Sequence, residues 1–214
     1  MHRPMFYTLA FVALPALATA LAAADESKKD VSKTDPAGVL LDVRLVAKKA
    51  TYTLDLGGKS GKEFRKLLDD EKNTRRFPEP PKVDLVLEFK NTGKEEIKFR
   101  IGPDGAEPML ELKGEGAATV DLGPNVSGRR SIDPKVIALA PGKTYEWPIQ
   151  SLKSLSFTRP QHQSYWTEPG EYTLTADIQT QVAPVPKGAK DRGDGFGDVK
   201  ITSAAATVKV VEGK

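Results

Sequence analysis

The chain has 214 residues, with 32 Lys and Arg against 29 Asp and Glu, a formal net charge of +3, and no cysteine. The absence of cysteine excludes disulfides, thiolate metal sites, a cysteine nucleophile and a lipid-anchored N-terminal cysteine. Charges of both signs are interleaved along the sequence, which predicts an ordinary solvated surface and no nucleic-acid partner.

The first 24 residues have the three regions of a secretory signal peptide. Arg3 supplies the basic start, Met5 to Leu21 form the apolar run, and either Ala20-Leu21-Ala22 or Ala22-Ala23-Ala24 supplies the small-residue cleavage site. Pro15 interrupts the run and charged residues follow it at once, which favours a cleaved leader over a transmembrane anchor. We therefore expect an exported protein, periplasmic or extracellular, with no stable membrane anchor after cleavage.

Residues 25–37 are rich in Lys, Asp and Ser, with Val31 as the one sizeable apolar residue, and we expect them to form a disordered linker. From residue 38 to residue 214, prolines and glycines punctuate the chain at short intervals, which is typical of an all-β protein. We expect these residues to form a single domain.

Alternation of apolar and polar residues predicts about ten strands, each with one buried face. The final strand changes phase at Ala204-Ala205-Ala206, which indicates a bulge or a change of sheet. Pro148 cannot donate to a ladder and marks its strand as an edge or a bulge. The predicted strands cover residues 39–46, 51–56, 83–90, 97–101, 109–113, 117–122, 135–139, 143–150, 172–179 and 199–210. The predicted core consists of Leu85, Leu87, Phe89, Ile97, Phe99, Tyr145, Trp147, Tyr172, Leu174, Ile178, Val208 and Val210.

One short helix interrupts the strand pattern. Ser60-Gly61-Lys62-Glu63 has the form of a capping box, and Phe64, Leu67 and Leu68 follow at helical spacing. We expect a helix over residues 60–72, lying across an open edge or end of the sheets. The proline-rich run at 77–81 predicts an extended connector after it.

No motif for catalysis stands out. After removal of the leader the chain has a single histidine, His162, and it has neither a Gly-x-Ser-x-Gly elbow nor a zinc-type histidine pair. We expect a non-enzymatic protein without a bound cofactor.

One carboxylate cluster could collect a calcium ion. Asp191, Asp194 and Asp198 lie in the glycine-rich stretch between the last two predicted strands, and carboxylates on a loop are calcium ligands. Lysines and arginines in the same stretch partly neutralise them. A flexible, exposed loop over residues 183–198 that is dispensable for folding is the preferred interpretation.

Two adjacent aromatic residues could form a platform for stacking sugars. Tyr165 and Trp166, with Trp147 as a possible neighbour, have the required side chains. The alternative is that both are core anchors beside a turn, with the tyrosine hydroxyl bonded to the backbone.

The order of strands and turns resembles bacterial immunoglobulin-like domains. The resemblance rests on the alternation from Leu85 to Phe89 with the turn Asn91-x-Gly93, on Ala140-Pro141-Gly142 before Tyr145, and on Pro169-Gly170 before the following strand. The chain is most similar to the intracellular proteinase inhibitor family. The resemblance implies an antiparallel immunoglobulin-like β-sandwich with one short inserted α-helix, and it makes protease inhibition an alternative function.

These observations together favour an interaction or structural module of the cell envelope or the secreted medium. We expect it to contact an envelope protein or polysaccharide through loops rather than through a pocket. A carbohydrate-binding module and a protease inhibitor are the alternative hypotheses.

Overall fold

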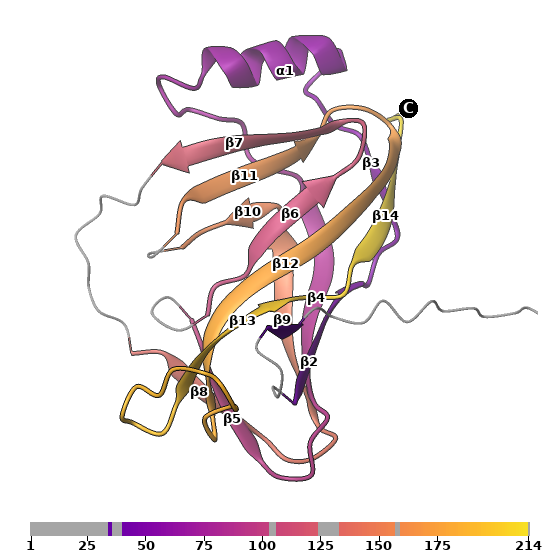
Figure 1. Cartoon of the computed structure of the whole chain (residues 1–214). Helices are drawn as coiled ribbons and strands as arrows, with labels where there is room; N and C mark the ends of the chain where they lie inside the picture. The colour runs from indigo at the N-terminus through magenta and orange to yellow at the C-terminus, as the bar shows by residue number, and fades with distance from the viewer. Residues whose placement is uncertain (1–33, 36–39, 103–105, 124–132, 157–158, 214) are drawn as a thin grey trace, which may run out of the picture.

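The computed structural model describes residues 34–35, 40–102, 106–123, 133–156 and 159–213 (Figure 1). The predicted signal peptide and most of the predicted linker lie outside these residues. Within them the protein is all-β with one helix, α1 (Gly61–Asp70). The strands are β1 (Thr34–Asp35), β2 (Leu41–Ala47), β3 (Thr51–Thr53), β4 (Lys82–Asn91), β5 (Ile97–Ile101), β6 (Met109–Lys113), β7 (Ala117–Gly123), β8 (Lys135–Leu139), β9 (Thr144–Ser151), β10 (Lys153–Ser154), β11 (Gln161–Trp166), β12 (Gly170–Ala183), β13 (Gly197–Thr202) and β14 (Ala206–Val211).

The long strand β12 organises the largest sheet. One of its edges pairs with β14 and then with β13, and its other edge pairs with β6 and then with β5, which continues to β8. Strand β3 joins the free side of β14 in parallel, and β1 joins β13. Two further sheets have the orders β2-β4-β9 and β10-β11-β7.

The predicted change of phase near the C-terminus is confirmed. The chain leaves β13 at Ser203, whose hydroxyl accepts a hydrogen bond from the amide of Ala176, and re-enters the sheet as β14. Between the two strands Ala204 bridges to the other sheet, where its amide donates to Val43 and its carbonyl accepts from Leu45. The break therefore ties the largest sheet to β2.

The main core lies between the largest sheet and the β2-β4-β9 sheet. The rings of Phe89 on β4 and Phe99 on β5 stack across it with centroids 4.9 Å apart. Of the twelve predicted core residues all but two are buried, and the exceptions, Tyr145 and Trp147 on β9, are half-buried against the same core. Pro148 is accommodated because β9 pairs only with β4 among the described strands.

The helix begins where the capping box predicts. The Ser60 hydroxyl accepts from the amide of Glu63, and the Glu63 carboxylate accepts from the amide of Ser60 at 2.8 Å. Phe64 and Leu68 are buried against Val120 of β7 and Tyr165 of β11, so α1 covers the β10-β11-β7 sheet at one end of the molecule (Figure 1). Phe64 and Tyr165 of this second, smaller core also border a groove beside α1.

The number of strands needs correction. The chain has fourteen strands in the described residues rather than about ten, because β1, β10 and β11 have no apolar alternation and the last predicted strand is divided in two. Two residues of the predicted linker, Thr34 and Asp35, pair with β13 as β1. No helix in the described part of the chain is long and apolar enough to cross a membrane.

Candidate binding groove

A groove of about 1000 Å³ lies at the end of the molecule that α1 covers. Its lining comes from five parts of the chain: β3 and the residues after it, the inner face of α1, the connector 78–82, the end of β11, and Gly213. Because these parts are distant in the sequence, the groove exists only in the folded protein. Its volume is at the upper end of the range of ordinary ligand sites.

Buried aromatic rings form the inner part of the lining. Tyr52 of β3 and Trp166 of β11 have ring centroids 5.2 Å apart, and Phe64 of α1 meets Tyr165 edge to face at 5.6 Å. Leu67 of α1 is half-buried beside them. The four rings are at most 7% exposed, so they support the groove from beneath, and the accessible apolar surface comes from half-buried residues such as Leu54, Leu67 and Pro78.

Two tyrosine hydroxyls form hydrogen bonds that hold segments of the groove lining in place. Tyr165 donates to the carbonyl oxygen of Pro78 at 2.6 Å, and Tyr52 accepts from the amide of Asp84 at 2.9 Å. Burial raises the pKa of both tyrosines above the usual value, so both hydroxyls keep their protons at physiological pH. The connector is thus attached to β11, and β3 to the beginning of β4.

The outer lining is charged, with an excess of lysine. Lys49, Lys59 and Lys82 are exposed, and none of them has an ion pair within the described residues. The Lys49 ammonium lies 5.0 Å from the centre of the Tyr52 ring. The acidic residues of the lining are Asp55, which accepts from the amide of Gly57, and Glu79.

The structure places the proposed sugar-stacking pair inside the core. Tyr165 is 1% exposed and Trp166 is 3% exposed, so their ring faces are covered by other side chains. They contribute to the groove lining without forming an open platform, and Trp147 lies on β9, outside the groove lining. The anchor interpretation holds for Tyr165, whose hydroxyl is bonded to the backbone as expected.

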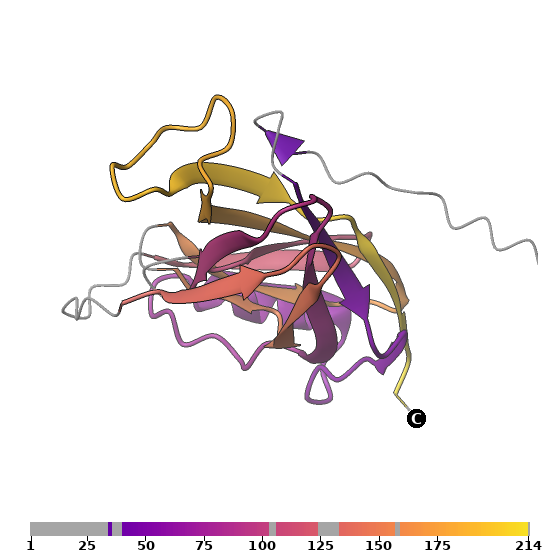
Figure 2. The same cartoon turned by 90° about the horizontal axis from the view of Figure 1, so that it is seen from below.

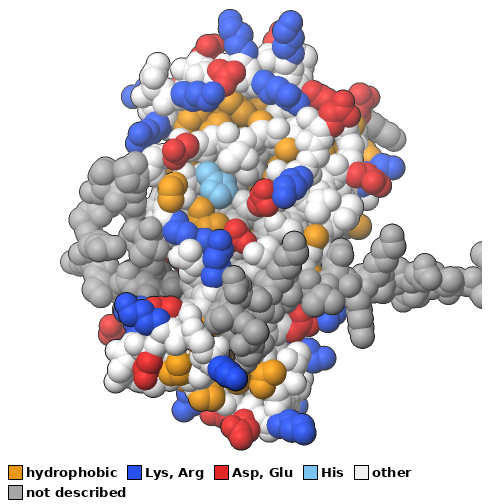
Figure 3. All heavy atoms as spheres, in the orientation of Figure 1, with side chains coloured by type: hydrophobic (Ala, Val, Ile, Leu, Met, Phe, Trp, Pro, Cys, Tyr) orange, Lys and Arg blue, Asp and Glu red, His pale blue; other side chains and the backbone are white. Residues whose placement is uncertain are grey.

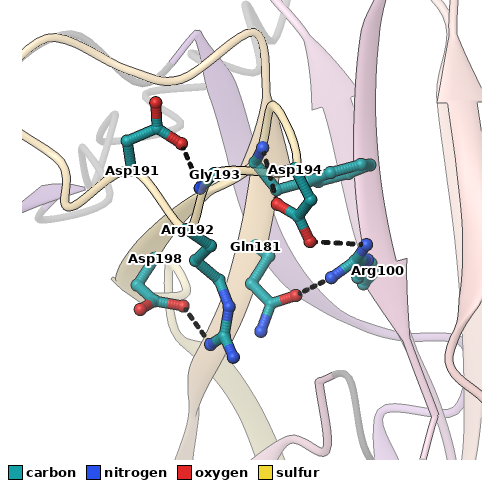
Figure 4. A network of polar contacts seen from close by, with 8 residues as sticks. Arg100, Gln181, Asp191, Arg192, Gly193, Asp194 and Asp198 are labelled. Atoms are coloured by element: carbon teal, nitrogen blue, oxygen red, sulfur yellow. Dashed lines mark hydrogen bonds and ion pairs between the residues drawn. The ribbon is translucent and has the colours of Figure 1, made fainter.

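The three aspartates proposed as calcium ligands each have a separate partner (Figure 4). Asp191 accepts from the amide of Gly193, Asp198 pairs with Arg192 at 3.1 Å, and Asp194 pairs with Arg100 of β5 at 3.1 Å. No group of three potential metal-ligating side chains is found in the part of the chain that the structure describes. The described loop brings the three carboxylates to different partners rather than to a shared point.

The same loop is anchored to the body of the protein. Arg100 also donates to the Gln181 side chain at 2.5 Å, and its guanidinium lies 4.2 Å from the centre of the Phe196 ring. The pKa of Asp194 is lowered, chiefly by the hydrogen bond from the amide of Phe196 and further by Arg100. Figure 2 shows that the loop nevertheless projects from the edge of the molecule. The side chains of Asp191, Arg192, Asp194 and Asp198 therefore all have partners within the protein.

His162, the one histidine of the predicted mature chain, has a structural contact. It lies half-buried on β11 with Nε2 2.7 Å from the carbonyl oxygen of Leu110 on β6, which ties the small sheet to the large one. Figure 3 shows the histidine in pale blue on a face where charges of both signs are scattered among apolar side chains. The interleaving of charge seen in the sequence is therefore also present on this face.

Comparison with known proteins gives no family assignment: no protein-family model matches the chain, and none of the curated proteins matches it. The sequence analysis missed Lys49, Lys59 and Lys82, since isolated lysines look like solvated surface. The signal that could have drawn attention to the site is the run Pro78 to Lys82, whose three prolines form a wall that cannot pair as a regular strand.

Proposed function

We propose that this protein is an exported, non-enzymatic module with an immunoglobulin-like β-sandwich fold that binds another protein of the cell envelope or the secreted medium. The facing sheets support the finer fold assignment. So does Tyr172 at the start of β12, whose hydroxyl donates to the carbonyl of Glu168 at 2.6 Å, as in the tyrosine corner of such domains. Export rests on the leader-like sequence of the first 24 residues.

The observation that carries the proposal is the groove beside α1. It combines half-buried apolar residues, which lie over a closed aromatic core, with three lysines that have no ion pair in the described residues. An apolar centre surrounded by a polar rim is the usual composition of a protein-binding site. The groove takes the place of the loops in this proposal because three charged side chains of the most prominent loop, residues 183–198, form ion pairs within the protein, namely Arg192, Asp194 and Asp198.

The test is capture of partners from an envelope extract by the tagged mature protein, compared with two charge-reversal variants. We call the three lysines of the outer lining, Lys49, Lys59 and Lys82, the rim. In the first variant, Lys59→Glu and Lys82→Glu reverse the charge of two of them. In the matched control, Lys143→Glu and Lys153→Glu reverse two exposed lysines outside the groove lining. All four lysines are exposed, so both variants are expected to fold with wild-type stability.

We expect a protein captured by the wild type and by the control but lost with the rim variant. Capture that is equal for all three proteins would show that the groove is not the binding surface. Tryptophan fluorescence is also measured on addition of soluble envelope polysaccharide. A shift that the rim substitutions abolish would show that the partner is a glycan and not a protein.

A further inference from the structure

The open edge of β3 lies at the groove. Strand β3 pairs with β14 through Thr51, Tyr52 and Thr53, and no other described strand pairs with it, so it ends the sheet. Thr53 and Leu54 line the groove. An unpaired strand edge presents backbone N–H and C=O groups that can pair with an added strand.

The opposite wall cannot occupy this edge itself. The connector contains Pro78, Pro80 and Pro81, and proline has no N–H to donate. Its position is fixed by the hydrogen bond from Tyr165 to Pro78. The groove therefore stays open beside β3 instead of closing by strand pairing.

The side chains around the edge define what an added strand would carry. Tyr52 is buried while its neighbours Thr51 and Thr53 are exposed, so one face of β3 continues into the aromatic interior and the other faces solvent. An added strand would direct alternate side chains to the same two faces, because successive side chains of a strand point in opposite directions. Apolar residues suit the inner face, where the half-buried Leu54 lines the groove. Acidic residues complement the rim lysines, for which the described part of the chain supplies no ion pair.

Building on the proposed function, we propose that the groove binds an extended segment of the partner protein that adds as a strand to β3, with apolar and acidic residues in alternation. This mode of recognition takes its affinity from main-chain hydrogen bonds and its specificity from the alternate side chains. Because β3 is short, a segment of only a few residues is needed to cover it.

The test uses the mature protein and a fluorescein-labelled heptapeptide of alternating Val and Glu, followed by fluorescence anisotropy. Two derivatives are N-methylated, one on the Val residues and one on the Glu residues. In a strand, only every second N–H faces a given neighbour, so methylation in one phase blocks an added strand and methylation in the other does not. A third peptide has Lys in place of Glu.

We expect the parent peptide to bind, one N-methylated derivative to bind at least about tenfold more weakly than the other, and the lysine peptide to lose at least about tenfold in affinity. The Lys59→Glu and Lys82→Glu variant should reverse the preference between the Glu and Lys peptides. Equal binding of the two N-methylated peptides, equal binding of the Glu and Lys peptides, or no binding at all each overturns strand addition. If the partner captured from extract still depends on the rim lysines in that case, the proposed function stands and only the binding mode is wrong.

Discussion

Tyr165 connects the groove wall to the sheet through one hydroxyl, and Tyr165→Phe isolates the contribution of that group. The substitution keeps the ring, which is 1% exposed and packs edge to face on Phe64. It removes the donor to the Pro78 carbonyl and the contact of 2.7 Å with the side-chain oxygen of Gln163. Gln163 is buried and Pro78 is half-buried, so the acceptor that the single hydroxyl proton serves loses its donor in a place that water reaches poorly.

The expected cost is about 2 kcal/mol, because leaving a buried acceptor without its donor costs roughly 1–3 kcal/mol. Tyr145→Phe is the matched control. Tyr145 is half-buried on β9, and its hydroxyl makes no hydrogen bond within the described residues. Its removal should change the free energy of unfolding by less than about 0.5 kcal/mol.

Urea unfolding followed by circular dichroism measures both variants. With a slope near 2 kcal/mol per M, typical of a domain of this size, Tyr165→Phe should lower the midpoint by about 1 M and leave the slope unchanged. Tyr145→Phe should leave the midpoint nearly unchanged. The reasoning is refuted if the two variants have equal midpoints, since the hydroxyl bond would then contribute nothing.

The same variant has a signature at alkaline pH. Burial is the main cause of the raised pKa of Tyr52, Tyr165 and Tyr172 in the folded protein. A raised folded pKa gives stability that is fully present below the unfolded value, near 10, and is lost as pH rises above it, since the unfolded state then binds fewer protons. Above pH 10 the stability of Tyr165→Phe should therefore fall less steeply than that of the wild type, by up to about 1.4 kcal/mol per pH unit. If the stability of the wild type and of Tyr165→Phe fell equally with pH, the raised pKa of Tyr165 would be contradicted.

The remaining predictions concern α1 and the loop 183–198. Gly61→Ala should lower the thermal midpoint, because the added methyl would overlap the carbonyl oxygen of Thr167. This overlap should outweigh the preference of a helix for alanine over glycine, which is about 1 kcal/mol. A raised midpoint would show that the helix can shift to make room. Asp194→Ala should accelerate tryptic cleavage within the loop by releasing it from Arg100, whereas Asp191→Ala, which removes a contact only to the loop itself, should not; equal cleavage would contradict the anchoring role. Calcium and chelator should give equal melting temperatures, because the described carboxylates have separate partners, and a calcium-dependent rise would restore the metal hypothesis.

Strands with one buried face could be predicted because burial imposes a visible alternation. In β4 and β12 the apolar residues of one face are buried, as expected, and β6 and β8 begin and end at the predicted residues. The helix was recognisable for a similarly local reason, since the capping box needs only Ser60 and Glu63. Where local pattern and tertiary burial agree, sequence alone is informative.

Strand β11 was missed because its burial is achieved with polar residues. Gln163 and Ser164 are 6% and 1% exposed. Their side chains are satisfied by contacts that only the folded chain supplies, namely Ser164 with Thr119 at 3.1 Å and Gln163 with Tyr165. A run of glutamine, histidine and serine has no apolar period, so the pattern gives no sign of a buried strand.

The groove could not be predicted because none of its parts is unusual alone. A three-residue strand, a proline-rich connector and isolated lysines are common features whose meaning depends on their relative placement. Tertiary contacts set that placement: Arg65 of α1 donates to the Thr167 hydroxyl at 2.8 Å and pairs with Glu168 at 3.0 Å, which positions the helix over the end of β11.

The inserted helix therefore explains why this end of the protein has a groove at all. The chain leaves β3, forms α1 and returns through three prolines before it enters β4, both edges of which are paired, with β2 and with β9. The helix covers the small sheet, and the prolines keep the returning segment from pairing with β3. Deleting α1 should thus remove the site together with its second core, whereas substitutions on the rim alter only what the site selects. Because rim substitutions are expected to change partner selection without removing the groove, the rim lysines are the best positions at which to test the proposed function.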